Sequence, residues 1–163
     1  MLEWLRSLFG VNTLKVTDPV FGILKGQIVV SDGMKNICWK AHRDFTWEGP
    51  AANVRVYSDE SGATQRQREL FADLHQHYPV LRHMIEKPLA QEYMALRDEW
   101  GFSGPPLGDP SEIWSVIHLV AIEVYGGEAY PDLVLCHAGD LDGEHDLNVS
   151  IKGWQVQEVM LEG

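Results

Sequence analysis

The feature that most constrains the fold is one long segment, residues 61–100, whose apolar side chains recur at steps of three and four. This spacing places them along one side of a helix, so the segment is expected to be helical and to bury that side. Pro79 fits the first turn of a second helix, and Pro88 removes a backbone donor inside it. We therefore predict a helical hairpin rather than one uninterrupted helix.

The segments on both sides of the helical region are rich in β-forming residues and are bounded by turn residues. Between residues 53 and 58, Val54 and Val56 alternate with Arg55 and Tyr57, as in a half-buried strand. Lys152-Gly153 is expected to form a two-residue turn, and a bulge is expected near Glu158. The predicted strands lie within residues 20–33, 36–45, 53–58, 118–125, 132–138, 147–153 and 154–161.

The order of strands, helices and strands predicts an α+β fold, a mainly antiparallel sheet with the helical hairpin packed on one face. With 163 residues, the chain is expected to form a single domain, residues 1–163. Glu3 and Arg6 interrupt the apolar start of the chain, and no apolar run approaches the roughly 20 residues of a membrane span. Cys38 and Cys136 are too few for a disulfide framework. These features predict a cytoplasmic protein without a membrane partner.

Charge is distributed very unevenly along the chain. The formal net charge is −11, but residues 1–108 contribute only −1, whereas residues 109–163 contribute −10 and contain Lys152 as their single basic side chain. Nucleic-acid binding depends on lysine and arginine side chains that neutralise phosphates. We therefore predict no nucleic-acid partner. An acidic surface raises the encounter rate with a basic protein, which makes a basic protein the expected partner.

The segment "LCHAGDLDGEHDLNV", residues 135–149, is the densest cluster of acidic and histidine side chains. Asp140, Asp142 and Glu144 copy the oxygen spacing that opens a calcium loop. His145 replaces the glycine that such a loop needs, and Ile151 replaces its bidentate glutamate. We therefore predict a solvated acidic turn, with no metal and no cofactor.

Catalytic motifs are missing from the sequence. No G-x-S-x-G element, phosphate loop or dinucleotide fingerprint occurs. Cys136 and His137 are neighbours on a predicted strand and are expected to point to opposite faces, which weakens them as a nucleophile and base. No catalytic residue is predicted, and we favour a protein that is not an enzyme. The alternative is a metal-dependent hydrolase centred on His137, Asp140 and His145.

Three short motifs occur in a fixed order, namely "DPVFG" at residues 18–22, "FTWEGP" at 45–50 and "DGEHDLNVSIKG" at 142–153. The arrangement resembles an uncharacterised bacterial domain family, one of the domains of unknown function. Such domains look like the immunity proteins of polymorphic toxin systems, in which small acidic cytoplasmic proteins plug the active site of a toxin. The resemblance implies binding to a toxin and no catalytic residues.

Together these observations predict a non-enzymatic cytoplasmic protein-binding domain, an immunity-like inhibitor of a basic toxin. Two alternatives stand beside it: a purely structural subunit, and a surface whose acidic groups only promote solubility because arginine and lysine side chains of the helical region neutralise them. No oligomeric state is predicted. The basic residues of the helical region that could neutralise the acidic groups are Arg66, Arg68, Arg82, Lys87 and Arg97. The expected partner-binding residues are Asp140, Asp142, Glu144, His145 and Asp146.

Overall fold

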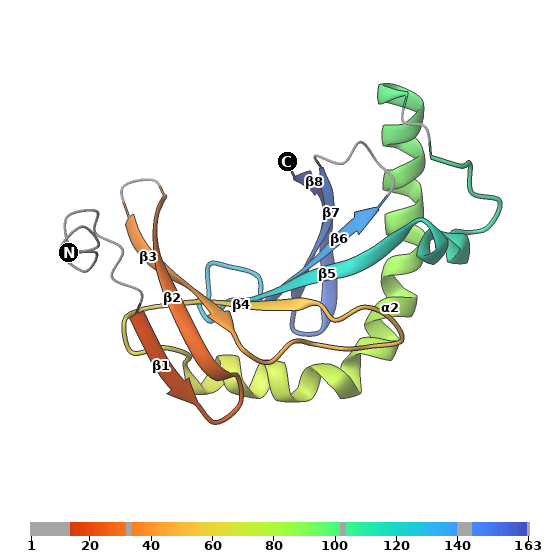
Figure 1. The fold of residues 1–163 in the computed structure, drawn as a ribbon. Coiled ribbons are helices and arrows are strands. Elements are labelled where there is room, and N and C mark those ends of the chain that lie inside the picture. The colour runs from red at the N-terminus through yellow and green to blue at the C-terminus, as the bar shows by residue number, and fades with distance from the viewer. Residues whose placement is uncertain (1–13, 32–33, 102–103, 140–144, 163) are drawn as a thin grey trace, which may run out of the picture.

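The computed structural model describes residues 14–31, 34–101, 104–139 and 145–162. These residues form one eight-stranded sheet whose strand order follows the chain, with a long helix along one side (Figure 1). The strands are β1 (Leu14–Asp18), β2 (Gly22–Ser31), β3 (Met34–Ala41), β4 (Asn53–Ser58), β5 (Ile117–Val124), β6 (Leu133–Gly139), β7 (Asp146–Lys152) and β8 (Gln155–Glu162). The expected α+β fold with a mainly antiparallel sheet is confirmed.

The one parallel pair of the sheet explains where the helix lies in the chain. All neighbouring strands are antiparallel except β4 and β5. A parallel pair cannot be joined by a tight turn and needs a long crossover connection. The helix α2 (Gln65–Trp100) and the 3₁₀ helix η1 (Pro110–Ser115) supply that connection.

The helical region is a single helix, so the predicted helical hairpin is wrong. Thr64 begins α2 with a capping box, in which its hydroxyl accepts from the Gln67 amide at 3.3 Å and the Gln67 side chain accepts from the Thr64 amide at 2.8 Å. Pro79 and Pro88 both lie inside the helix. A proline removes one hydrogen bond and permits a bend without ending the helix. Figure 1 shows α2 bending around the sheet instead of reversing.

A reversal of the chain within the helical region would also need a turn, and α2 contains no glycine, the residue that forms tight turns most easily. No glycine occurs between Gly62 and Gly101, and Gly101 ends α2 in a left-handed conformation with φ of 69°.

In the described part of the chain, no helix combines the length and apolar character needed to cross a bilayer.

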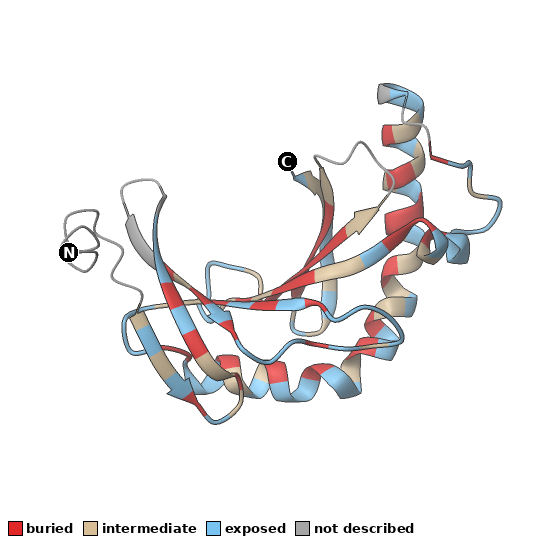
Figure 2. Ribbon diagram, viewed as in Figure 1, coloured by how far each residue is buried: buried red, intermediate tan, exposed pale blue. Residues whose placement is uncertain are grey.

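The core lies between α2 and the face of the sheet that α2 covers. Figure 2 shows buried positions along the sheet side of α2 and at alternate positions of many strands. On β7, for example, Leu147, Val149 and Ile151 are completely buried. Burial of each such side chain stabilises the fold by about 1.5–3 kcal/mol. The largest fully buried side chains include Trp39, Tyr93, Phe21 and Phe45.

The hairpin of β7 and β8 determines which residues of these two strands stand opposite each other. Its turn is Gly153-Trp154, one residue later than predicted, and both residues have positive φ, 55° and 60°. Positive φ is unfavourable for tryptophan, but the Trp154 ring stacks on His77 at 4.0 Å and fixes the position. The bulge expected near Glu158 is confirmed, since Ser150 pairs with Glu158 and Ile151 with Val156.

Candidate functional site

The structure places only part of the predicted acidic site. Asp140, Asp142 and Glu144 lie outside the described residues, whereas His145 and Asp146 are half-buried where β7 begins. Asp146 stands directly opposite Glu162 in the antiparallel register of β7 and β8. No arginine or lysine of the described residues forms an ion pair with either carboxylate. Two like charges therefore face each other at the end of this hairpin.

Asp146 and Glu162 border a pocket on the open face, which is the face of the sheet that α2 does not cover. We call it the open-face pocket. It has a volume of about 280 Å³. Apolar side chains from β5 and β6 form part of the lining, and polar side chains from β4, β5, β7 and β8 form the rest. The lining residues are Asn53, Arg55, Val120, Ala121, Glu123, Cys136, Asp146, Asn148 and Glu162.

At one end of the open-face pocket, Glu123 is fully satisfied by three donors. Arg55 donates to Glu123 Oε1 at 3.1 Å, the Tyr57 hydroxyl to the same oxygen at 3.0 Å, and the Tyr125 hydroxyl to Oε2 at 2.7 Å. The two tyrosine rings stack with centroids 4.7 Å apart. Burial, together with the Glu123 carboxylate, raises the pKa of both tyrosines, so they remain protonated donors. This end needs no further cation.

At the other end, Asn148 is only 4% exposed and is incompletely satisfied. Its Nδ2 donates to Glu162 Oε2, but its Oδ1 has no hydrogen-bond partner within the described structure. Buried polar atoms are nearly always hydrogen-bonded, and an unsatisfied one costs about 1–3 kcal/mol. The Asp146 end of the pocket therefore combines two carboxylates that lack an arginine or lysine ion pair within the described residues with an acceptor that needs a donor.

The arginines of α2 are largely used elsewhere. Arg66 pairs with Asp132 at 2.7 Å, and Arg68 pairs with Asp18 at 2.8 Å. Arg97 pairs with Asp98, and the Arg82 guanidinium lies over the Trp114 ring at 4.4 Å. Among the ion pairs of the described residues, Arg66 with Asp132 is therefore the one that links an α2 arginine to an acid of the C-terminal half. Within the described residues, direct ion pairing between the arginines of α2 and the acidic half is confined to that position.

Cys136 and His137 lie on opposite faces of β6. Cys136 lines the open-face pocket, and burial, followed by the Glu123 carboxylate, raises the pKa of its thiol to about 12. A thiol with such a pKa stays protonated at neutral pH and is a poor nucleophile. His137 is fully buried on the other face, 5.9 Å from the Trp114 ring, and burial lowers its pKa to about 4. The two side chains do not form a nucleophile and base pair.

Of the three donors named for a hydrolase, the structure describes only His137 and His145. His137 Nδ1 lies 3.3 Å from the Leu147 carbonyl on the covered side of the sheet, whereas Asp140 is outside the described residues. Within residues 14–31, 34–101, 104–139 and 145–162, no three histidine, cysteine or acidic side chains are grouped as metal ligands. The described donor set therefore offers no metal centre for the alternative function.

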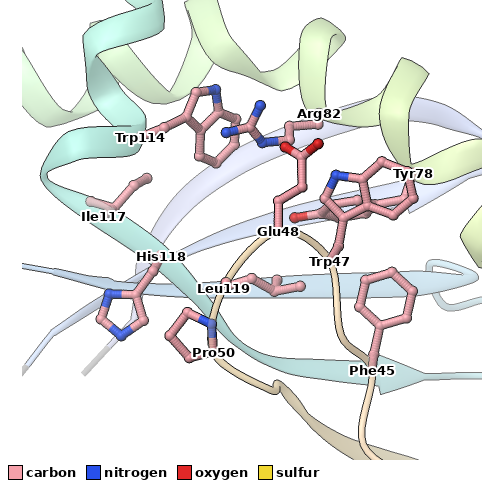
Figure 3. Close-up of a pocket in the computed structure, with 11 residues that line it drawn as sticks. Phe45, Trp47, Glu48, Pro50, Tyr78, Arg82, Trp114, Ile117, His118 and Leu119 are labelled. Atoms are coloured by element: carbon pink, nitrogen blue, oxygen red, sulfur yellow. The ribbon is translucent and has the colours of Figure 1, made fainter.

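A second, smaller pocket of about 80 Å³ lies between the 45–50 loop, α2 and the start of β5 (Figure 3). Aromatic rings form much of its wall, and Tyr78 meets Trp47 and Phe45 edge-on with centroids 5.8 and 5.1 Å apart. Glu48 extends from the loop toward Arg82 in Figure 3, and its own φ is positive, 42°. Trp47 therefore acts as an apolar anchor that holds the loop against α2.

Comparisons of the chain with models of protein families, with curated protein sequences and with solved structures found no match.

Several residues of the open-face pocket were missed in the sequence analysis. Alternation within 53–58 and 147–152 does place Arg55, Tyr57 and Asn148 on the face opposite the core residues. What the sequence lacks is the order of the strands, which brings Glu123 beside Arg55 and Glu162 opposite Asp146. The sequence pattern therefore indicates several of the strands, but it does not indicate which strands lie next to each other in the sheet.

Proposed function

We propose that this chain is a non-enzymatic protein-binding domain that receives a basic protein at the Asp146 end of its open face. One observation carries the proposal: Asp146 and Glu162 stand opposite each other across β7 and β8, and no arginine or lysine of the described residues forms an ion pair with either. Like charges directly opposite on antiparallel strands destabilise the pair. A cation supplied by a partner removes that repulsion, so the arrangement favours binding.

The charge distribution supports the same type of partner. Residues 109–163 carry a formal charge of −10, and Asp140, Asp142 and Glu144 lie within six residues of Asp146 in the sequence. Such a field attracts cationic proteins and repels nucleic acid. Toxin domains that act on nucleic acid are cationic because their substrate is anionic, which makes them suitable partners. By covering the basic surface of a toxin, the domain would act as an immunity-like inhibitor.

The test is affinity capture from the source cell with the complete chain as bait, followed by quantitative mass spectrometry. We expect a basic protein to bind the wild-type chain at low salt and to be lost from the variant D146K/E162K. The matched control is D73K/E99K, which makes the same charge change at two exposed positions of α2. This control should retain the protein.

Salt provides the second readout, because the Debye length falls from about 10 Å at 0.1 M to about 3 Å at 1 M. Retention by the wild-type chain should decrease as salt rises. Equal capture by D146K/E162K and by D73K/E99K would show that the Asp146 end of the open face is not the binding surface.

A further inference from the structure

We infer that the open-face pocket holds the side chain of one arginine from the basic partner. The inference rests on the proposed function and specifies what enters the site. At the Asp146 end, three side chains offer hydrogen-bond acceptors: the carboxylates of Asp146 and Glu162, and Oδ1 of Asn148, which has no partner in the described structure. A group with several donors and a positive charge matches this need.

The rest of the lining suits the aliphatic part of such a side chain. Val120, Ala121 and the uncharged Cys136 thiol line the pocket beside the acceptors. Arginine and lysine both bury an apolar stem while their charged tip stays among polar groups. The volume of about 280 Å³ lies just below the roughly 300–1,000 Å³ of small-molecule sites, and so suits one side chain better than a larger ligand.

The two ends of the pocket fix the direction of the inserted side chain. Arg55 lines one end and is held by Glu123 at 3.1 Å, so a second cation would be repelled there. Asp146 and Glu162 attract it to the other end. The cationic tip therefore points toward Asn148 and the hairpin of β7 and β8, with the stem along the apolar lining.

Guanidinium fits this end better than ammonium. It is planar, is more weakly hydrated and presents five N–H donors, which allows a bidentate bond to a carboxylate with donors left for an amide oxygen. Its weaker hydration reduces the cost of entering a half-buried site beside Asn148. Arginine is also enriched among the residues that dominate binding energy at protein interfaces.

The experiment is a titration of the complete ¹⁵N-labelled chain with N-acetyl-arginine methylamide, followed by NMR. We expect the signals of the Asn148 side-chain amide and of the β7 and β8 backbone to shift. The citrulline analogue, which has the same shape but no charge, should bind at least tenfold more weakly. The lysine analogue should bind more weakly than arginine. Equal affinity for citrulline, or shifts confined to other parts of the chain, would overturn the inference. Equal affinity for lysine would overturn the choice of arginine.

Variants test the assigned acceptors without large changes of shape. D146N/E162Q should reduce the affinity for the arginine probe at least tenfold, whereas D73N/E99Q, with the same charge change on α2, should leave it unchanged. N148A keeps both carboxylates and should weaken binding about threefold or more. The amide spectrum of each variant reports whether it is folded. Full affinity in folded D146N/E162Q would overturn the inference.

The two proposals fail in different ways. If the arginine probe does not bind but protein capture still depends on Asp146 and Glu162, the arginine pocket is wrong and the proposed function stands. If the probe binds as expected but capture is equal in D146K/E162K and in the control, the pocket is supported and the proposed protein-binding function is wrong.

Discussion

The two faces of strand β7 show how differently the same strand is used. Leu147, Val149 and Ile151 are completely buried against the core, and each fills space between α2 and the sheet. Asn148, which lies between two of them, points to the open face and leaves Oδ1 without a hydrogen bond in the described structure. On β7, the covered face is therefore apolar and closed by packing, whereas the open face carries a polar atom that a partner can satisfy. The contrast holds for β7 alone, because on the neighbouring β6 the His137 Nε2 atom is buried on the covered face without a hydrogen-bond partner in the described structure.

Neighbouring alanine substitutions should give the largest contrast between the faces. Leu147→Ala removes a fully buried side chain and should lower the free energy of unfolding by about 2–5 kcal/mol. Asn148→Ala removes a buried acceptor that has no partner, together with a hydrogen bond to the exposed Glu162 that water can replace, so the change should stay within about 0.5 kcal/mol or be stabilising. Urea denaturation measures both. Similar losses for the two variants would show that the open face is packed as tightly as the covered one.

His137 extends the comparison to pH, because it is the titratable group buried on the covered face of β6. Its pKa falls from 6.5 to about 4 on folding, so the unfolded chain binds the proton more tightly. Stability is therefore complete above pH 6.5 and is lost as pH falls toward 4. Between pH 7 and pH 5 the loss should be about 2 kcal/mol.

Two variants test whether His137 causes this loss of stability at low pH. His137→Phe should remove most of the dependence on pH in urea denaturation at pH 5 and pH 7. His83→Gln, at an exposed position of α2, should retain it. An unchanged pH dependence in His137→Phe would contradict the burial of a neutral imidazole.

A smaller effect is expected at the ion pair that does join α2 to the acidic half. Asp132 is 3% exposed, and its carboxylate accepts hydrogen bonds from the Arg66 guanidinium and the Gly153 amide. The Arg66 side chain is 59% exposed. Burial alone would raise the pKa of Asp132, but these hydrogen bonds lower it. Because the arginine is largely solvated, Arg66→Ala should cost only about 1 kcal/mol. Lys87→Ala, at an exposed position, should change thermal or urea stability by less than about 0.5 kcal/mol. Equal effects would show that the pair with Asp132 contributes nothing.

The sequence predicted the strands better than the helical region or the site. Alternation in 53–58 and in 147–152 reflects burial on one face, so these strands were predictable from local pattern. Pro79 and Pro88 suggested a hairpin, because local rules treat proline as a break, but packing of both halves of α2 on one core keeps the helix continuous. Tertiary contacts decided that outcome.

Of the residues that line the open-face pocket, only Asp146 was predicted from the sequence to bind a partner. The many acidic residues of segment 140–146 indicated a site there, but the other residues that line the pocket with Asp146 come from distant parts of the chain. Glu162 reaches it through the register of the last hairpin, and Arg55 and Glu123 meet through the parallel pair of β4 and β5. Charge counts cannot reveal such neighbours, because pairing between strands depends on the whole topology.

The most direct test of the account is the stability of D146N/E162Q against the wild-type chain by urea denaturation at low and high salt. Because the two carboxylates face each other without an ion pair to any arginine or lysine of the described residues, the account predicts that the variant is more stable by about 0.2–1 kcal/mol at low salt. The difference should nearly vanish at about 1 M salt. A variant that is less stable than wild type at low salt would contradict the account, because it would show that groups of the chain itself stabilise these two charges by more than their mutual repulsion.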